Sequence, residues 1–293
     1  AVGLTQLAWF DRSGKKLEAL EQPAEYWDPR ISPDGRRVGF SVGDPGDAWS
    51  YDFGRKVRTR LTFGPASEGS PAWSPDGSRI AFMSARTGGG DLYVKPASGA
   101  SGEQMLVASN MLKVPTSWSR DGRFLLYEVA TGSSARRDLW IVSVPDRKAS
   151  PILATQADEA EAGFSPDGKW IVYQSDQSGR YEIYVRPFPG AGTQWQISTE
   201  GGIHPVWRAD QTEILYESPD GKLVSVDVSV SGADFESGSP KVLFQMRTKI
   251  APNRNFDVSP DGRQILVNTP AIDVGDQSAP VILVQNWTSL LTR

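Results

Sequence analysis

Six equivalent positions, one ahead of each copy of a recurring turn motif, include five side chains suited to binding a polar or charged group. Each lies four residues before the first residue of the motif, and together they are Asp28, Ser70, Pro115, Glu161, His204 and Asn255. Carboxylates and an imidazole brought together can bind a cation, a cationic side chain or a polar ligand. With one flanking lysine added and the proline left out, the predicted ligand-binding residues are Asp28, Ser70, Lys113, Glu161, His204 and Asn255. No cofactor is expected apart from a divalent cation that these groups could hold, and the identity of any metal is left open.

The same residues do not form a recognisable catalytic set. His204 is the only histidine, and its neighbours Pro205 and Trp207 favour a packed or rim position. The sequence contains no Gly-x-Ser-x-Gly motif, which argues against a serine hydrolase triad. A zinc site would need carboxylates alone to complete it. We assign no catalytic residue, and a water-filled site without a ligand is the alternative interpretation.

The motif that spaces these residues is the turn Ser-Pro-Asp-Gly, at residues 32–35, 74–77, 165–168 and 259–262, with altered copies at 119–122 and 208–211. Proline fixes φ at the first corner, aspartate bonds to the local backbone, and glycine accepts a positive φ. We therefore interpret the motif aspartates as structural. Successive aspartates are separated by 42, 45, 46, 43 and 51 residues. A further copy at 218–221 is too close to start a repeat and predicts a second turn within the fifth one.

Short strands rich in β-branched and aromatic residues follow the turns. In the first repeat they include residues 37–40, 47–49 and 57–62, and the last of these alternates apolar with polar residues. Four strands in a period of this length are typical of a propeller blade. The predicted fold class is all-β, a six-bladed β-propeller of four-stranded antiparallel blades. The six candidate positions should lie just before the first strand of each blade, where loops reach an axial channel.

One apolar position recurs in every repeat, directly before the turn. Its six residues are Ile31, Trp73, Trp118, Phe164, Trp207 and Val258. An apolar residue at the same place in each blade predicts packing between neighbouring blades.

Both termini contribute strands to the last blade. Residues 6–10 and 16–20 resemble a third and a fourth strand, whereas residues 256–258 and 264–267 supply a first and a second. Closing the ring with strands from both ends removes free sheet edges. Residues 281–284 could also claim the third position, and the sequence does not decide between the two.

The repeats run from end to end, which predicts a single propeller domain over residues 1–293. Its sixth blade is built from residues 251–293 plus 1–24. The longest interval between motifs contains residues 229–234, which are expected to form a polar loop at the rim.

Composition excludes several classes of protein. The net charge is −4 with a pI of about 5.2, and no basic stripe is present, so we expect no nucleic-acid partner. The absence of cysteine excludes disulfides and thiolate metal sites. No apolar run approaches the roughly 20 residues needed to cross a bilayer, so we expect no membrane insertion by this chain. The pattern is already under way at Ala1, and we expect a longer protein in which any membrane tether lies upstream.

The repeat resembles that of TolB-type six-bladed propellers. The resemblance rests on residues 61–63 (Leu-Thr-Phe), 70–77 (Ser-Pro-Ala-Trp-Ser-Pro-Asp-Gly) and 91–94 (Asp-Leu-Tyr-Val). Residues 7–12, 184–190, 256–262 and 286–288 are more narrowly similar to the C-terminal propellers of bacterial membrane-anchored serine/threonine kinases. That resemblance implies a location on the periplasmic or extracellular side of a bacterial membrane, and a sensing or binding role. The chain itself has no kinase motif set, because its Asp-Phe-Gly at 52–54 stands alone.

The sequence favours a non-catalytic binding or sensing propeller that recognises a protein, a peptide or a small ligand through its loops and axial channel. Rigid sheets that hold variable loops are suited to recognition. Two enzymatic alternatives remain. One is a lyase or hydrolase that uses the channel-mouth carboxylates, and the other is the propeller half of a prolyl-oligopeptidase-like peptidase. A structural spacer without a ligand is a third alternative.

Overall fold

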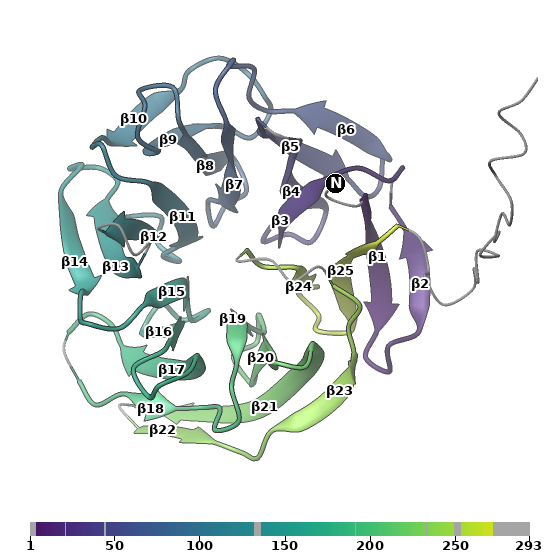
Figure 1. The fold of residues 1–293 in the computed structure, drawn as a ribbon, viewed down its shortest axis with the longest axis vertical. Helices are drawn as coiled ribbons and strands as arrows, with labels where there is room; N and C mark the ends of the chain where they lie inside the picture. The colour runs from purple at the N-terminus through teal and green to yellow at the C-terminus, as the bar shows by residue number, and fades with distance from the viewer. Residues whose placement is uncertain are drawn as a thin grey trace, which may run out of the picture.

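Six antiparallel sheets surround a central axis in the computed structural model, which confirms the six-bladed propeller (Figure 1). The structure describes residues 4–271, apart from residues 21, 44, 132–135, 191, 233 and 249–252. Every regular element in the described part is a strand, and none of it forms an apolar helix long enough to cross a membrane.

Blades one to three are each four strands in chain order, from the axis to the rim. Blade one contains β3 (Tyr26–Ile31), β4 (Arg37–Val42), β5 (Asp47–Asp52) and β6 (Val57–Arg60). Blade two contains β7 (Glu68–Trp73), β8 (Arg79–Ser84), β9 (Asp91–Pro96) and β10 (Gln104–Val107). Blade three contains β11 (Lys113–Trp118), β12 (Phe124–Thr131), β13 (Arg136–Ser143) and β14 (Ala149–Leu153).

Blade four repeats this order, whereas blades five and six modify it. Blade four contains β15 (Glu159–Phe164), β16 (Trp170–Ser175), β17 (Glu182–Pro187) and β18 (Trp195–Gln196). Blade five contains β19 (Ile203–Trp207), β20 (Glu213–Glu217), β21 (Lys222–Ser231), β22 (Asp234–Ser237) and β23 (Lys241–Gln245). Blade six contains β24 (Phe256–Val258), β25 (Gln264–Pro270), β1 (Thr5–Asp11) and β2 (Lys16–Ala19).

The ring is closed by strands from both ends of the chain, as the sequence predicts. Blade six has the order β24-β25-β1-β2, and β1 pairs with β25 from Thr5 opposite Pro270 to Asp11 opposite Gln264. Strand β1 therefore holds the third position of this blade. The competing candidate, residues 281–284, lies outside the described residues.

The prediction of a polar loop at residues 229–234 is wrong for most of that stretch. Strand β21 continues to Ser231 and forms a hairpin with β22, in which Val230 faces Phe235. The buried side chains of Val228 and Phe235 pack against the Trp170 side of blade four, while Ser229 is exposed. This alternation of buried and exposed residues stabilises a strand. The other half of β21 pairs with β23, so two short strands share the outer position of blade five.

The motif turns are held by the same local hydrogen bonds in six places. The serine hydroxyl donates to the aspartate carboxylate at 2.6 Å in the turns that begin at Ser32, Ser74, Ser119, Ser165, Ser218 and Ser259. The hydrogen bond from Ser74 and those from Ser78 lower the pKa of the Asp76 carboxyl to about 2. These carboxylates are occupied within their own turns, in agreement with a structural role.

The buried apolar core consists of separate clusters at the junctions between neighbouring blades. Six clusters of buried apolar residues lie in the described part, one between each pair of neighbouring blades. Tryptophans at the recurring apolar position also bond across these contacts. Trp73 Nε1 donates to the Arg30 carbonyl at 2.8 Å, and Trp118 Nε1 donates to the Ala72 carbonyl at 3.2 Å. The predicted packing between blades is thus present, and it gives a rigid ring.

Candidate functional site

The candidate positions lie inside the innermost strands rather than before them, except for Asn255, which directly precedes β24. The strand register shifts next to the other five, which marks a β-bulge in each innermost strand. Asp28, Ser70, Glu161 and His204 have φ angles of 54°, 52°, 52° and 56°. Left-handed backbone is unfavourable for residues other than glycine, and bulges of this kind often re-aim side chains next to functional sites. Repetition in four blades indicates that the fold maintains this conformation.

Each strained residue except Asp28 has its backbone N–H bonded to a side chain of the preceding blade. The acceptors occupy one equivalent position on the second strand of that blade. The pairs are Ser70 with Ser41 at 2.9 Å, Glu161 with Glu128 at 2.5 Å, and His204 with Gln174 at 2.8 Å. Pro115 has no N–H, and the residue at the acceptor position of blade two is Met83, which has no oxygen in its side chain. Blade three therefore lacks the N–H donor at this position, and blade two lacks the matching side-chain acceptor.

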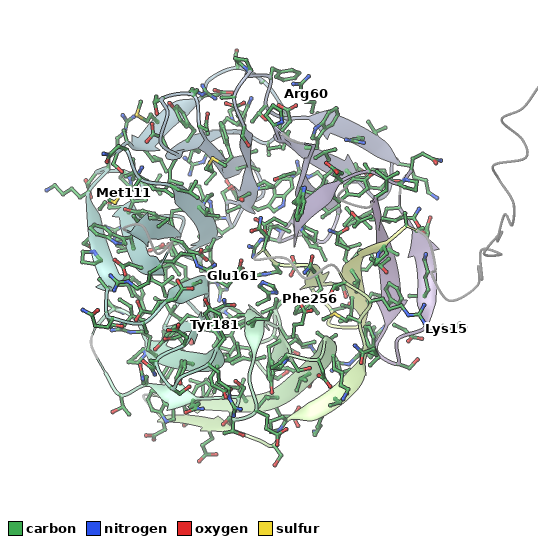
Figure 2. The ribbon with its side chains drawn as sticks, viewed as in Figure 1. Lys15, Arg60, Met111, Glu161, Tyr181 and Phe256 are labelled. Carbon is green, nitrogen blue, oxygen red and sulfur yellow. The ribbon has the colours of Figure 1, made fainter. Side chains whose placement is uncertain are left out.

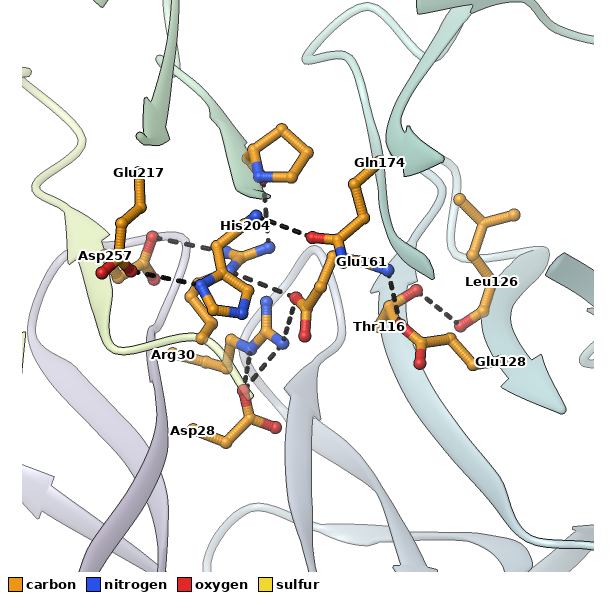
Figure 3. A network of polar contacts seen from close by, with 12 residues as sticks. Asp28, Arg30, Thr116, Leu126, Glu128, Glu161, Gln174, His204, Glu217 and Asp257 are labelled. Carbon is orange, nitrogen blue, oxygen red and sulfur yellow. Dashed lines mark hydrogen bonds and ion pairs between the residues drawn. The ribbon is translucent and has the colours of Figure 1, made fainter. Parts of the chain in front are cut away.

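Asp28 and Glu161 meet on the axis through Arg30, which is not among the residues predicted from the repeat spacing (Figure 3). Arg30 Nε donates to Asp28 Oδ1 at 2.9 Å, and Arg30 Nη2 donates to Glu161 Oε2 at 3.2 Å. Arg254 Nε lies 3.6 Å from the same Glu161 oxygen. Arg30 thus reaches from blade one to blade four, and Glu161 lies at the centre of the ring (Figure 2). We call Asp28, Arg30, Glu161 and Arg254 the axial ion-pair cluster.

Burial and charge separate the pKa values of the axial acids. Burial raises the pKa of Asp28, and Arg30 opposes this only in part. Burial also acts on Glu161, but the charges of Arg30 and Arg254 outweigh it and lower its pKa to about 2. Burial raises the pKa of Glu128 to about 7, because its main cationic neighbour, Arg137, offsets less of the cost. Glu161 is therefore the anionic centre of the axis, while Glu128 titrates near neutral pH.

The remaining predicted residues have other surroundings. His204 is buried, with Nδ1 3.3 Å from Glu217 Oε2, and its position is shown in Figure 3. Lys113 is directed to the neighbouring blade, where it contacts Asp91 at 3.3 Å and the Met111 carbonyl at 2.8 Å. It therefore joins blades two and three and does not enter the axial ion-pair cluster. Ser70 and Asn255 are both buried.

No three His, Cys, Asp or Glu side chains in the described part of the chain are placed to share a metal ion. The space between the Asp28 and Glu161 carboxylates is taken by the Arg30 guanidinium, which supplies the positive charge there. The axis is therefore built as a set of ion pairs.

A cavity of about 390 Å³ opens beside this cluster, on the side of the motif turns. We call it the funnel. Its floor is one equivalent residue from each blade, namely Arg30, Ala72, Ser117, Gly163, Val206 and Asp257. Its wall is the recurring apolar position, with Ile31, Trp73, Trp118, Phe164, Trp207 and Val258. Its mouth is the second residue of each turn, with Pro33, Pro75, Arg120, Pro166, Ala209 and Pro260. Arg254 lines it as well.

Arg30 could have been found from the repeat alignment. Four of the five residues equivalent to it are small or apolar, so a charged residue at that position of an inner strand indicates a specific partner. Asp257 is the other exception, and its Oδ2 accepts the Ile31 backbone N–H at 2.7 Å. The repeat spacing does not show that the partner of Arg30 is Glu161, because Glu161 lies 131 residues away in the sequence, on the opposite blade.

Comparison with known sequences confirms the TolB-type resemblance. Residues 12–137 match the family model described as TolB beta propeller domain. The uncharacterized peptidase YuxL of Bacillus subtilis (strain 168) is 26% identical over 207 residues, which cover 54% of this chain and 31% of that protein. The uncharacterized protein Atu1656 of Agrobacterium fabrum is 22% identical over 272 residues, with 86% and 88% covered. The chain therefore spans about a third of the first relative and most of the second.

Solved structures share the fold at low sequence identity. A TolB-type protein of Agrobacterium tumefaciens superposes with a TM-score of 0.70 at 18% identity, covering 92% of this chain and 99% of that one. TolB from Acinetobacter baumannii gives 0.62 at 19% identity, with 81% and 65% covered. An oligogalacturonate lyase in complex with manganese gives 0.57 at 15% identity, with 92% and 97% covered. TolB structures and an oligogalacturonate lyase thus share this architecture, and the fold alone does not determine a function.

Proposed function

We propose that this chain, with its TolB-type repeats, is a non-catalytic binding module that takes a segment of a protein or peptide partner into the funnel. The observation that supports this most is a single cavity to which all six blades contribute equivalent residues. Its volume of about 390 Å³ is within the range of known ligand sites. Trp73, Trp118 and Trp207 line it, and tryptophan is enriched among the residues that dominate binding energy. A rigid ring keeps these aromatic side chains in place before binding, which lowers the entropic cost.

The axial carboxylates support recognition more than catalysis. Asp28 and Glu161 are buried and paired with Arg30, and Glu128 accepts the Glu161 backbone N–H. A segment in the funnel would contact the aromatic wall and leave these pairs intact. A lyase or hydrolase mechanism would first have to free one carboxylate from its arginine.

We place this module outside the cytoplasm, on the periplasmic or extracellular side of a bacterial membrane. The likeness to TolB-type propellers supports this location, and the sequence resemblance to the propellers of membrane-anchored kinases leads to the same expectation. The test is labelling of the natural full-length protein with an amine reagent that cannot cross membranes, in cells whose outer envelope alone has been permeabilised, since Lys15 and Lys16 are exposed. Modification of the propeller lysines in cells with a permeabilised outer envelope is expected, and modification only after complete lysis would contradict the location.

The binding proposal is tested by selecting linear 12-residue peptides from a phage-displayed library on the purified chain. Two variants separate the funnel from the rest of the surface. Ala209→Trp adds an indole at the funnel mouth, and Ala100→Trp adds one on an exposed loop of blade two as the matched control. We expect selected peptides to lose at least about tenfold in affinity on Ala209→Trp, which corresponds to about 1.4 kcal/mol, and to retain binding to Ala100→Trp. Failure to select any peptide, or equal binding to both variants, would refute the proposal.

A further inference from the structure

Two buried arginines that line the funnel, Arg30 on its floor and Arg254 beside it, each leave one nitrogen without a hydrogen-bond acceptor. Only 7% of the Arg30 side chain and 8% of the Arg254 side chain are exposed. Asp28 and Glu161 occupy Nε and Nη2 of Arg30, whereas its Nη1 has no hydrogen-bond partner in the described part of the chain. Arg254 Nη2 donates to the Pro205 carbonyl at 3.3 Å, and its Nε is likewise without a hydrogen bond. Buried donors of this kind are rare in native proteins and indicate a missing acceptor.

The acceptors that line the same floor are already in use. Asp257 Oδ2 accepts the Ile31 N–H at 2.7 Å, and Asp257 Oδ1 accepts the Val258 N–H at 2.9 Å. Ser117 Oγ accepts the Phe164 N–H at 3.1 Å. The floor therefore offers free donors, and a ligand that brings acceptor oxygens would be complementary to it.

The two guanidinium groups lie side by side, because a single Glu161 oxygen is 3.2 Å from Arg30 Nη2 and 3.6 Å from Arg254 Nε. The Glu161 carboxylate is thus shared by the two guanidinium groups. Burial and the neighbouring charge of Arg30 lower the pKa of Arg254, in keeping with two like charges held close together. Asp28 also pairs with Arg30 at 2.7 Å, and Asp257 Oδ1 lies 3.8 Å from Arg254 Nη1, but none of these carboxylates makes a hydrogen bond to Arg30 Nη1 or Arg254 Nε. A carboxylate brought by a ligand would supply acceptors to these two nitrogens.

We infer that the funnel floor binds a carboxylate carried by the inserted segment, with Arg30 Nη1 and Arg254 Nε as its donors. This inference rests on the proposed function, since it assigns the chemistry of the group that reaches the bottom of the funnel. The carboxylate can come from a chain end or from an Asp or Glu side chain. Both sources present two oxygens in one plane, which suits recognition by guanidinium groups.

The source is tested with synthetic copies of the peptides selected from the phage library. Each is made with a free C-terminal carboxylate, as the C-terminal amide, and with Asp and Glu replaced by Asn and Gln. We expect removal of the recognised carboxylate to weaken binding at least about tenfold, since charge-assisted hydrogen bonds are roughly twice as strong as neutral ones. Loss in the amide alone identifies a chain end, and loss in the Asn and Gln copies alone identifies a side chain. Peptides that bind equally in all three forms overturn the inference while the proposed function stands, whereas the absence of any binding peptide removes the proposed function itself.

Ser117 offers a matched pair of variants that keeps the fold intact. The equivalent residue Asp257 already accepts the next blade's N–H through a carboxylate, so Ser117→Asp can keep the bond to Phe164 while adding a negative charge to the floor. Ser117→Asn adds a side chain of the same size without charge. We expect the acidic peptides to bind at least about tenfold more weakly to Ser117→Asp than to Ser117→Asn, with unchanged melting temperatures. Equal affinity of the two variants, both folded, would overturn the carboxylate assignment.

Discussion

Glu128 is the buried acid whose titration should control the pH dependence of stability near neutral pH. Its Oε1 accepts the Glu161 N–H, and its Oε2 lies 3.5 Å from Arg137 Nη1. In the next blade Gln174 makes the same backbone contact to His204. Glu128→Gln should therefore preserve the support of the bulge while removing the ionisable group, and Arg137 retains its ion pair with Asp158 at 2.8 Å.

The expected magnitude follows from the pKa of Glu128, which burial raises from 4.5 to about 7 in the folded protein. A group whose folded pKa is raised stabilises the protein while it is protonated, and this contribution is lost as the pH rises through the folded pKa. At 1.36 kcal/mol per pH unit the full effect is about 3.4 kcal/mol, of which about 2.5 kcal/mol falls between pH 5 and pH 8. The pKa of Glu161 is shifted in the opposite direction, to about 2, so its contribution to the free energy of unfolding is lost only in acid.

The assay is urea unfolding followed by tryptophan fluorescence, at constant ionic strength, in steps from pH 5 to pH 8. Relative to Glu128→Gln, the parent protein should lose about 2.5 kcal/mol of its free energy of unfolding across this range. Glu236→Gln, at an exposed position on β22, is the control and should follow the parent curve. If the parent and Glu128→Gln show parallel curves, the assignment of the raised pKa to Glu128 is wrong.

Three further predictions concern the ring and its axis. Deletion of residues 1–24 should cause aggregation or a large loss of stability, because the edge of β25 that pairs with β1 becomes free; a truncated chain that melts like the parent would contradict the closure. Arg30→Met should cost about 3–5 kcal/mol in the free energy of unfolding, since Asp28 would lose its ion pair and Glu161 would keep only the more distant Arg254. Adding Glu161→Gln should restore part of that loss in the same urea titration, and an additive double variant would argue against the coupling. Trp73→Phe should cost about 1 kcal/mol through the lost bond to the Arg30 carbonyl, and an unchanged urea midpoint would show that this bond contributes nothing.

The number and closure of the blades could be predicted from the sequence. The Ser-Pro-Asp-Gly turn depends on hydrogen bonds between residues two to five positions apart, as at Ser74 and Asp76. The local sequence is therefore enough to predict the turn wherever it occurs. Its recurrence gave the number of blades, and the incomplete strand sets at the two ends gave the closure between β1 and β25. The sequence predicts a loop at residues 229–234 because serine and glycine outnumber apolar residues there. The structure has a hairpin instead, because the buried Phe235 side chain next to this stretch packs against blade four.

The arrangement of charges on the axis could not be predicted from the sequence. Equivalent spacing placed Asp28, Glu161 and His204 near one another, but it could not show that Arg30 crosses the ring and pairs with Glu161 from the opposite blade. It also could not show that Lys113 turns away to Asp91. A repeat fixes which positions reach the axis, because every blade has the same local geometry. Which charges then pair depends on side chains that extend across the ring and on the burial that makes an unpaired charge costly, and both exist only once the ring is closed.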